Sequence, residues 1–244
     1  MRVEIWSDIA CPWCYVGKAR FEKALAGFAH RDGVEVVHRS FELDPDRAKD
    51  DVQPVLTMLT AKYGMSEAQA RAGEDNLGAQ AAAEGLDYRT RGRDHGNTFD
   101  MHRLLHLAKE RGRQSELLDA LYRANFAEER SVFAEGDERL AELAVAAGLD
   151  ADEARGVLAD PAAYADEVRA DEREAARLGA GGVPFFVLDR KYGVSGAQPA
   201  EVFAQALAQA WDEHQPLTLL QDGDGGGDGG ADVCGPDGCA VPRS

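Results

Sequence analysis

Apolar and polar residues first alternate along this chain with a period of two and then recur at helical spacing. Val3 and Ile5 alternate with polar neighbours, which predicts a strand over residues 2–6. A helical pattern follows over residues 12–29, and a second strand is expected over residues 34–43. This order predicts a strand–helix–strand unit, and parallel pairing of its strands would make the connection a right-handed crossover.

The long middle of the chain, residues 45–179, has a helical pattern almost throughout. Ser66 and Gln69 suit a capping box at one helix start. Pro161 is typical of another helix start, and Gly179 of the end of that helix. Two apolar stripes mark buried helix faces: Met101, Leu104, Leu105 and Ala108, and Leu117, Leu118, Leu121 and Tyr122.

Strand character returns after this helical block. Two short strands are expected over residues 185–188 and 192–195, followed by a helix from Pro199 to about Trp211. The chain therefore has the order βαβ, a helical block, then ββα, which predicts an α/β fold. Residues after Leu217 are rich in Gly and Asp and have no apolar period, which is typical of a flexible acidic tail.

We accordingly divide the chain into three parts. Residues 1–44 and 180–215 form one α/β domain, residues 45–179 form a helical insertion domain, and residues 216–244 form the tail. With 244 residues, of which 44% are hydrophobic, the chain is large enough to bury a substantial core.

Charge and hydropathy exclude several classes of partner and location. The formal net charge of −17 argues against nucleic acid and against an anionic membrane, since both require a basic face. Met1 leads directly into a strand, so we expect no secretory signal, and no stretch approaches a membrane span. A cytoplasmic protein with reduced thiols is therefore the expectation.

The tetrapeptide Cys11-Pro12-Trp13-Cys14 carries the chemistry that the sequence predicts. It stands where a strand gives way to a helix, and Pro12 suits the first helical position, which makes Cys11 the expected N-cap. Unpaired amides and the helix dipole would favour a thiolate at Cys11, the candidate nucleophile. Cys14, one turn further in, is expected to be more buried and is the candidate resolving thiol.

Two plainer interpretations of the motif compete with redox chemistry. With Cys234 and Cys239, four sulfur ligands are available for a zinc ion, but structural zinc pairs usually lie on loops rather than at a helix start after a strand. A purely structural disulfide would close a very small loop and add little stability. The interpretation adopted is redox chemistry, with no metal and no cofactor.

These residues resemble a known family. A CxxC that opens the first helix, and a Val183-Pro184 pair that opens the returning hairpin, look like a thioredoxin-like fold interrupted by a helical insertion, as in the DsbA family. The strings Cys-Pro-Trp-Cys, Gly-Val-Pro-Phe-Phe at 182–186 and Ser-Gly-Ala-Gln at 195–198 resemble its cytoplasmic FrnE-like branch. The likeness spans residues 1 to about 212, and a terminal Cys-x4-Cys is also found in that branch.

The resemblance implies that the bond before Pro184 is cis, that Pro184 faces the CxxC, and that Val183 offers its backbone to a substrate segment. A cis bond before proline costs only about 0.5–1 kcal/mol, and an extended peptide that pairs with Val183 would hold its cysteine over Cys11. The alternative is that Pro184 only begins an edge strand.

Other residues are weaker candidates. Asp8, three positions before Cys11, either caps backbone amides or shuttles the proton of Cys14, and capping is favoured. Trp13 is either an exposed platform for substrate, together with Pro12, or packs onto the inserted helices. Asn97 and His102 have counterparts in relatives of this fold, but an N-cap role for Asn97 and a surface or hydrogen-bonded position for His102 are favoured over an active-site role.

Two function classes compete. The first is a dithiol-disulfide oxidoreductase or isomerase acting on protein or small-molecule thiols and disulfides, with glutathione as one candidate. The second is a glutathione-dependent isomerase or transferase, as in kappa-class transferases and chromene-carboxylate isomerases, which share the implied architecture. Those relatives tend to have serine in place of Cys11 and need no Cys14, so redox chemistry is favoured. A non-enzymatic zinc-bound or holdase-like module is a third interpretation.

The sequence leaves the direction of electron flow open, because 30 mV corresponds to about 1.4 kcal/mol and no motif resolves that difference. It does suggest a second redox pair. Cys234 and Cys239 bracket Gly-Pro-Asp-Gly, which suits a type I β-turn, so their disulfide should form readily. A Gly-rich connection would let this pair reach Cys11 and relay electrons to or from it. The alternative is a spacer with idle cysteines.

Overall fold

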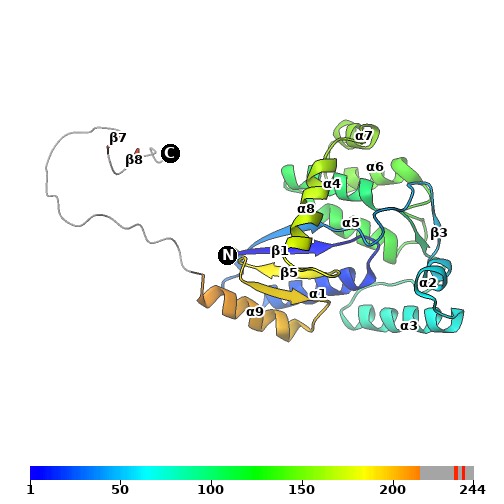
Figure 1. Ribbon diagram of the computed structural model, residues 1–244, viewed down its shortest axis with the longest axis horizontal. Coiled ribbons are helices and arrows are strands. Elements are labelled where there is room, and N and C mark those ends of the chain that lie inside the picture. The colour runs from blue at the N-terminus through cyan, green and yellow to red at the C-terminus, as the bar shows by residue number, and fades with distance from the viewer. Residues whose placement is uncertain (215–233, 236–237, 240–244) are drawn as a thin grey trace. The chain divides into compact units, whose positions relative to one another are not determined.

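The computed structural model describes residues 1–214, 234–235 and 238–239. Within residues 1–214, the elements follow one another as Figure 1 shows: β1 (Arg2–Ser7), α1 (Pro12–Ala26), a 3-10 turn (Arg31–Gly33), β2 (Glu35–Ser40), β3 (Gln53–Pro54), α2 (Val55–Tyr63), α3 (Glu67–Ala83), β4 (Asp94–His95), α4 (Phe99–Glu110), α5 (Gln114–Phe126), α6 (Gly136–Ala146), α7 (Ala151–Ala159), α8 (Ala165–Arg177), β5 (Phe185–Leu188), β6 (Tyr192–Ser195) and α9 (Ala200–Asp212).

A four-stranded sheet in the order β2-β1-β5-β6 forms the centre of this part of the chain. β1 and β2 are parallel over their full length, so α1 is the predicted crossover between them. β5 runs antiparallel to β1 and forms a hairpin with β6. The βαβ and ββα units that the sequence predicts therefore meet in one sheet, although the helical segment separates them along the chain.

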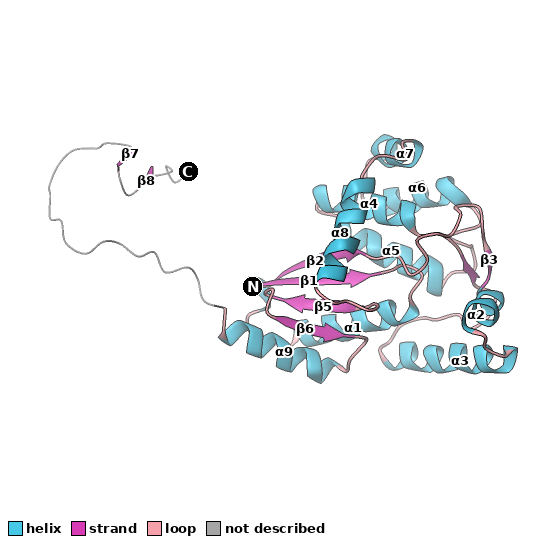
Figure 2. Ribbon diagram, in the orientation of Figure 1, coloured by secondary structure: helices cyan, strands magenta, loops and turns pink. Residues whose placement is uncertain are grey.

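Helices cover both faces of the sheet (Figure 2). On one face, alternate residues of β1 and β5 pack against α1 and α9, with Phe21, Phe186 and Phe203 in mutual contact. On the other face, Trp6 packs near Ala175 of α8 and donates its indole N–H to a backbone carbonyl of that helix. β1 is thus buried on both faces, although its apolar and polar residues alternate.

A second core lies among the inserted helices. It includes the two apolar stripes expected from the sequence, on α4 and α5, together with side chains of α6 and α7. Cys11 and Cys14 belong to this core, so the start of α1 lies where the sheet and the inserted helices meet. Among residues 1–214, 234–235 and 238–239, no helix is long and apolar enough to span a membrane.

Several predicted boundaries need correction. The helix expected from Pro161 begins only at Ala165, because Asp160 accepts the N–H of Ala162 in a tight turn and Tyr164 has a positive φ of 57° that interrupts helical geometry. The segment 45–179 is not helical throughout, since β3 and β4 pair within it. The capping box of Ser66 and Gln69 is confirmed.

Two short strands, β7 (Cys234–Gly235) and β8 (Gly238–Cys239), pair antiparallel with Cys234 opposite Cys239. Residues 236–237, the centre of the predicted β-turn, lie outside the described residues. So does most of the predicted acidic tail.

Candidate active site

The CxxC motif opens α1 as the sequence predicts. Cys11 is the N-cap in an extended conformation, and Pro12 occupies the first helical position. Cys11 is 5% exposed and Cys14 is 1% exposed, so the second sulfur is the more deeply buried, as expected. Both cysteines are free thiols. This is the arrangement of a pair in which one sulfur is reached from outside and the other attacks from within.

The contact that Cys11 makes differs from the expectation in one respect. Its sulfur makes no capping hydrogen bond to the amides of α1. Instead, the thiol donates to the backbone carbonyl of Val183 at 3.7 Å between sulfur and oxygen. Cys11 is further fixed by its own N–H, which donates to the carbonyl of Asp8. The sulfur of Cys11 therefore faces the residue before Pro184.

The Val183–Pro184 peptide bond is cis, as the resemblance implies. Pro184 is buried, and its carbonyl accepts the N–H of Gly196 at 2.8 Å, which begins the β5–β6 hairpin. Gly17 of α1 faces it across the site: a Cβ at Gly17 would lie 3.0 Å from the Pro184 ring and 3.3 Å from Ala197. The absence of a side chain at Gly17 thus lets α1 approach the cis-proline loop closely. Gly17 was not among the site residues predicted from the sequence.

The surroundings of Cys14 make its thiol difficult to ionise. The pKa of the Cys14 thiol is raised well above its usual range, first by burial and then by its interaction with Cys11. The neighbouring Tyr122 hydroxyl is buried without a hydrogen-bond partner among the described residues, and burial raises its pKa too. Cys14 is therefore a protonated thiol at rest, which suits a resolving residue that must not react prematurely.

Asp8 acts as a structural acceptor in this geometry. It is 1% exposed, and its carboxylate accepts the N–H of Ala10 at 3.2 Å and that of Leu43 at 2.8 Å. Burial by itself raises the pKa of Asp8, but the interaction with His102 and the N–H of Leu43 outweigh burial and lower it. A carboxylate with a lowered pKa is a weak proton acceptor, so these contacts favour capping over proton shuttling.

The expectations for Asn97 and His102 need correction. The N-cap of α4 is Thr98, while the side chain of Asn97 accepts the N–H of Phe99 and donates to the carbonyl of Arg47. His102 is neither on the surface nor hydrogen-bonded to a described residue: it is 1% exposed, and its Nε2 lies 3.4 Å from Asp8 Oδ1. The sequence pattern around His102 does not distinguish a buried histidine on α4 from a surface histidine.

A cavity of about 420 Å³ opens beside Cys11. Pro12, Trp13 and Val183 line it on the side of the CxxC motif, and residues of α2, α3 and β4 line the other side. Trp13 is 38% exposed and lines the cavity, which favours the accessible position over packing onto the inserted helices; its role as a platform for substrate stays a prediction. Asn97 and His102 do not line this cavity.

Within the described part of the chain, no group of three or more His, Cys, Asp or Glu side chains is placed to hold a metal ion. Cys234 and Cys239 cannot be assigned to such a group, because the positions of their side chains lie outside what the structure describes. The chemistry that the geometry supports is exchange between sulfur atoms at Cys11, resolved by Cys14.

Comparisons with known proteins agree with this geometry. The crystal structure of probable DsbA oxidoreductase SCO1869 from Streptomyces coelicolor is 81% identical, covers 100% of both chains and has a TM-score of 0.88. Uncharacterized protein YwbO of Bacillus subtilis is 27% identical over 210 residues, 85% of this chain and 96% of its own. The cytosolic disulfide reductase DsbM from Pseudomonas aeruginosa, solved with GSH, is 20% identical over 86% of this chain and 98% of its own, with a TM-score of 0.58, a likeness of fold.

The family model of the DSBA-like thioredoxin domain matches residues 2–208, which include the CxxC motif, the helical insertion and the cis-proline loop. The predicted α/β architecture, a thioredoxin-like fold with a large helical insertion, is thereby confirmed. The chain belongs to the family of DSBA-like thioredoxin domain proteins.

Proposed function

We propose that this protein is a thiol-disulfide oxidoreductase in which Cys11 exchanges with the substrate and Cys14 resolves the mixed disulfide. The observation that carries the proposal is the position of the Cys11 thiol against the Val183 carbonyl beside cis-Pro184, with Cys14 buried behind it. Membership of the DSBA-like family and the 81% identical probable DsbA oxidoreductase support it.

The reaction balances within the site. The Cys11 thiolate attacks one sulfur of a substrate disulfide, a bond forms between them, and the other substrate sulfur leaves as a thiolate that takes up a proton. Cys14 then loses its proton and attacks the Cys11 sulfur. The protein becomes a disulfide, and the second substrate sulfur leaves as a thiol. Oxidation of a substrate dithiol is the same sequence in reverse.

An extended substrate segment has a place to bind in this scheme. Among the donors that the structure describes, only the weak thiol donor of Cys11 reaches the carbonyl of Val183 in the resting state. A backbone N–H of the substrate is a stronger donor and would replace it when Cys11 becomes bonded to substrate sulfur. Within the family we assign the chain to the FrnE-like branch with a cytoplasmic location, on the strength of its three sequence strings.

The glutathione-dependent isomerase is the less favoured alternative. That chemistry has no use for a second cysteine, whereas Cys14 lies one helical turn behind Cys11 at 1% exposure. Glutathione fits the proposed function better as an external thiol that regenerates the dithiol. The proposal also includes the relay, in which Cys234 and Cys239 exchange electrons with the CxxC pair.

The test uses the full-length protein and two variants. Cys11→Ser should abolish insulin reduction and oxidative refolding activity, because no nucleophile remains. Cys14→Ser should instead accumulate mixed disulfides at Cys11, detected by mass spectrometry, with turnover lost. Full turnover in Cys14→Ser would require a monothiol mechanism.

The relay is tested in the same Cys14→Ser background, where a disulfide between Cys11 and Cys234 or Cys239 is expected. If that disulfide is absent, and turnover is unchanged in a Cys234→Ser, Cys239→Ser variant, the relay is excluded while the rest of the proposal stands.

A further inference from the structure

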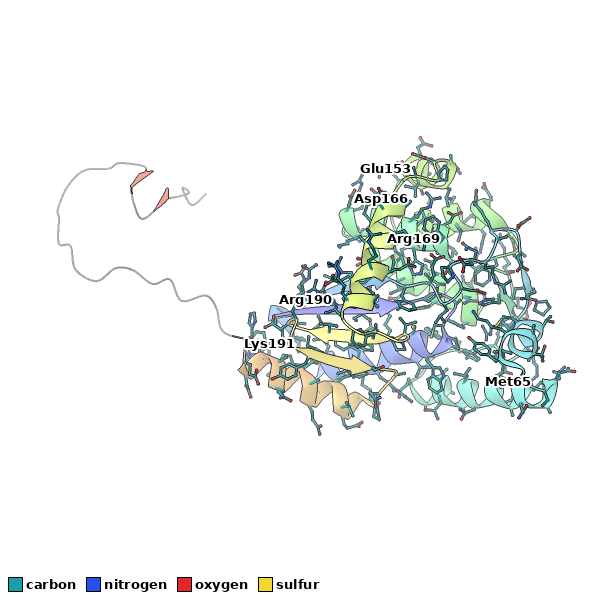
Figure 3. All side chains as sticks on the ribbon, in the orientation of Figure 1. Met65, Glu153, Asp166, Arg169, Arg190 and Lys191 are labelled. Atoms are coloured by element: carbon teal, nitrogen blue, oxygen red, sulfur yellow. The ribbon has the colours of Figure 1, made fainter. Side chains whose placement is uncertain are left out.

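The cavity beside Cys11 has a wall that the exchange of sulfur atoms does not require. Cys11 and Trp13 line one side, and the opposite side is built by α2, α3 and the segment that joins them. Figure 3 shows Met65 at the end of the molecule where α2 and α3 meet. A volume of about 420 Å³ lies within the range of about 300–1,000 Å³ that is usual for small-molecule pockets.

This wall is apolar. Met58 and Leu59 of α2, Met65, and Leu77 of α3 face the cavity. Two of the exposed large hydrophobic residues of the described chain, Trp13 at 38% and Tyr63 at 58%, also belong to its lining, one from each side. Exposed aromatic residues that gather at one cavity mark a site for an apolar group, whereas single ones scattered over a surface need no explanation.

The lysine and the arginine that line the cavity are already paired. Arg93 and Glu74 form a buried ion pair at 2.6 Å, with each side chain 5% exposed. Lys62 donates to the carbonyl of Leu43 at 3.1 Å and lies 3.4 Å from Asp44.

The histidine of the lining adds no cation. Burial, followed by the charge of Arg47, lowers the pKa of His95, so its ring is neutral near pH 7. The cavity therefore offers no free cation to the carboxylates of an acidic ligand such as glutathione.

We infer that the substrates of this site include disulfides and thiols carried by an apolar group of low molecular weight, which occupies the cavity while its sulfur is bonded to Cys11. The inference rests on the proposed function and names its substrate class. In the step concerned, the Cys11 thiolate attacks the sulfur that bears the apolar group, the other sulfur leaves with the electron pair of the broken bond, and the apolar group stays in the cavity until Cys14 releases it as a thiol. Reduced protein supplies both electrons, so a single turnover needs no further reductant.

The experiment uses reduced full-length protein and mixed disulfides that all release pyridine-2-thione, so that the leaving group and its absorbance are constant. The retained group is ethyl, 2-phenylethyl, 2-(2-naphthyl)ethyl or glutathionyl. Each second-order rate constant is divided by that of the same probe with 2-mercaptoethanol, which removes differences in intrinsic reactivity. Normalised rates should rise from ethyl to naphthylethyl by at least about tenfold, and glutathionyl should not exceed phenylethyl.

A matched pair of glycine variants locates the effect. Gly73 of α3 lines the cavity, and a Cβ there would meet only the end of Met65, at 4.0 Å, so Gly73→Phe can place its ring in the cavity. Gly156 of α7 is exposed, away from the cavity, with no atom within 4 Å of its Cβ position, so Gly156→Phe is the control. Gly73→Phe should reduce the naphthylethyl-to-ethyl ratio to within about twofold of one, whereas Gly156→Phe should keep the ratio of the native protein.

The outcomes separate this inference from the proposed function. Reaction at Cys11 with a flat series, a glutathionyl probe that reacts fastest, or an unchanged ratio in folded Gly73→Phe would overturn the apolar substrate class and leave the oxidoreductase in place. Release of pyridine-2-thione at the native rate by Cys11→Ser would overturn the proposed function itself. Circular dichroism of each variant establishes that the rates refer to folded protein.

Discussion

The two walls of the active site are built in different ways. The wall that carries Cys11 and Pro184 consists of a helix start and a strand start held by the central sheet, and the Cys11 thiol contacts the backbone carbonyl of Val183 there. The opposite wall consists of α2 and α3, outside the sheet, and meets the cavity with side chains such as Met58 and Leu77.

This difference indicates that the two walls have different roles in the site. Backbone geometry fixes where sulfur atoms exchange, and it tolerates little displacement because α1 and the cis-proline loop are in close contact at Gly17. The side chains of α2 and α3 set the shape and polarity of what lies beside the reacting sulfur. Unbranched methionine side chains suit that role, because they adapt to occupants of different shape. Three sets of substitutions test this division, beyond the cysteine and cavity variants described above.

The largest effect is expected in the helical wall, at the buried pair of Arg93 and Glu74. Arg93→Met leaves the Glu74 carboxylate buried without its partner, which should lower the free energy of unfolding by about 3–5 kcal/mol, measured with urea. The double variant Glu74→Leu, Arg93→Met should recover most of this loss, because it removes both charges. A single variant as stable as the native protein would show that the pair does not hold this wall together.

An intermediate effect is expected at Asp8, which connects the CxxC loop to the start of the inserted segment through Leu43. Asp8→Asn should cost about 1–3 kcal/mol at pH 7, because buried hydrogen bonds to a charged acceptor are weakened. The folded-state pKa of Asp8 is lowered, so its contribution is present above the ordinary value of 3.8 and is lost as the pH falls through the folded-state pKa.

The measurement is the free energy of unfolding against pH. The native protein should lose more stability in acid than Asp8→Asn, and Asp32→Asn, at a side chain that is 97% exposed, should follow the native curve. A slower formation of the Cys11–Cys14 disulfide in Asp8→Asn, at unchanged stability, would instead assign Asp8 to proton transfer from Cys14.

The smallest effect compares one glycine in each wall. Alanine at either helix interior gains about 0.5–1 kcal/mol from lower backbone entropy in the unfolded chain. Gly73→Ala should show this gain, because its Cβ meets only Met65 at 4.0 Å. Gly17→Ala should not show this gain in stability, because its Cβ would lie only 3.0 Å from the Pro184 ring.

Gly17→Ala should also slow exchange at Cys11 several-fold, measured with the ethyl probe. Equal stability and equal rates in the two alanine variants would contradict the contrast between a rigid wall and an adaptable one.

The rigid wall, with Cys11 and Pro184, could be predicted from the sequence. The adaptable wall, formed by α2 and α3, could not. A period of two in β1 and a proline after Cys11 are local signals, and the elements they predict are present. The cis bond before Pro184 followed from the family resemblance and is also present. The cavity results from packing between α2, α3 and the CxxC loop, and no short stretch of sequence contains that information.

The errors have equally physical causes. β3 and β4 have two residues each, too few to show a period. Pro161 suits a helix start by its own conformation, but the turn at Asp160 and the positive φ of Tyr164 delay the helix to Ala165. His102 has an ordinary position on a helical pattern, and only the fold places its ring beside Asp8.

The position of the adaptable wall along the chain has an evolutionary consequence. The side chains that α2, α3 and β4 contribute to the cavity all belong to one continuous stretch, 55–95, which lies between β2 and β5 along the chain and adds no strand to the central sheet. Recombination or gradual divergence within that stretch can therefore exchange the ligand that is recognised while the sheet, the thiols and the cis-proline loop are inherited unchanged. A chimaera that takes residues 55–95 from a relative is the corresponding route to altered selectivity in the laboratory.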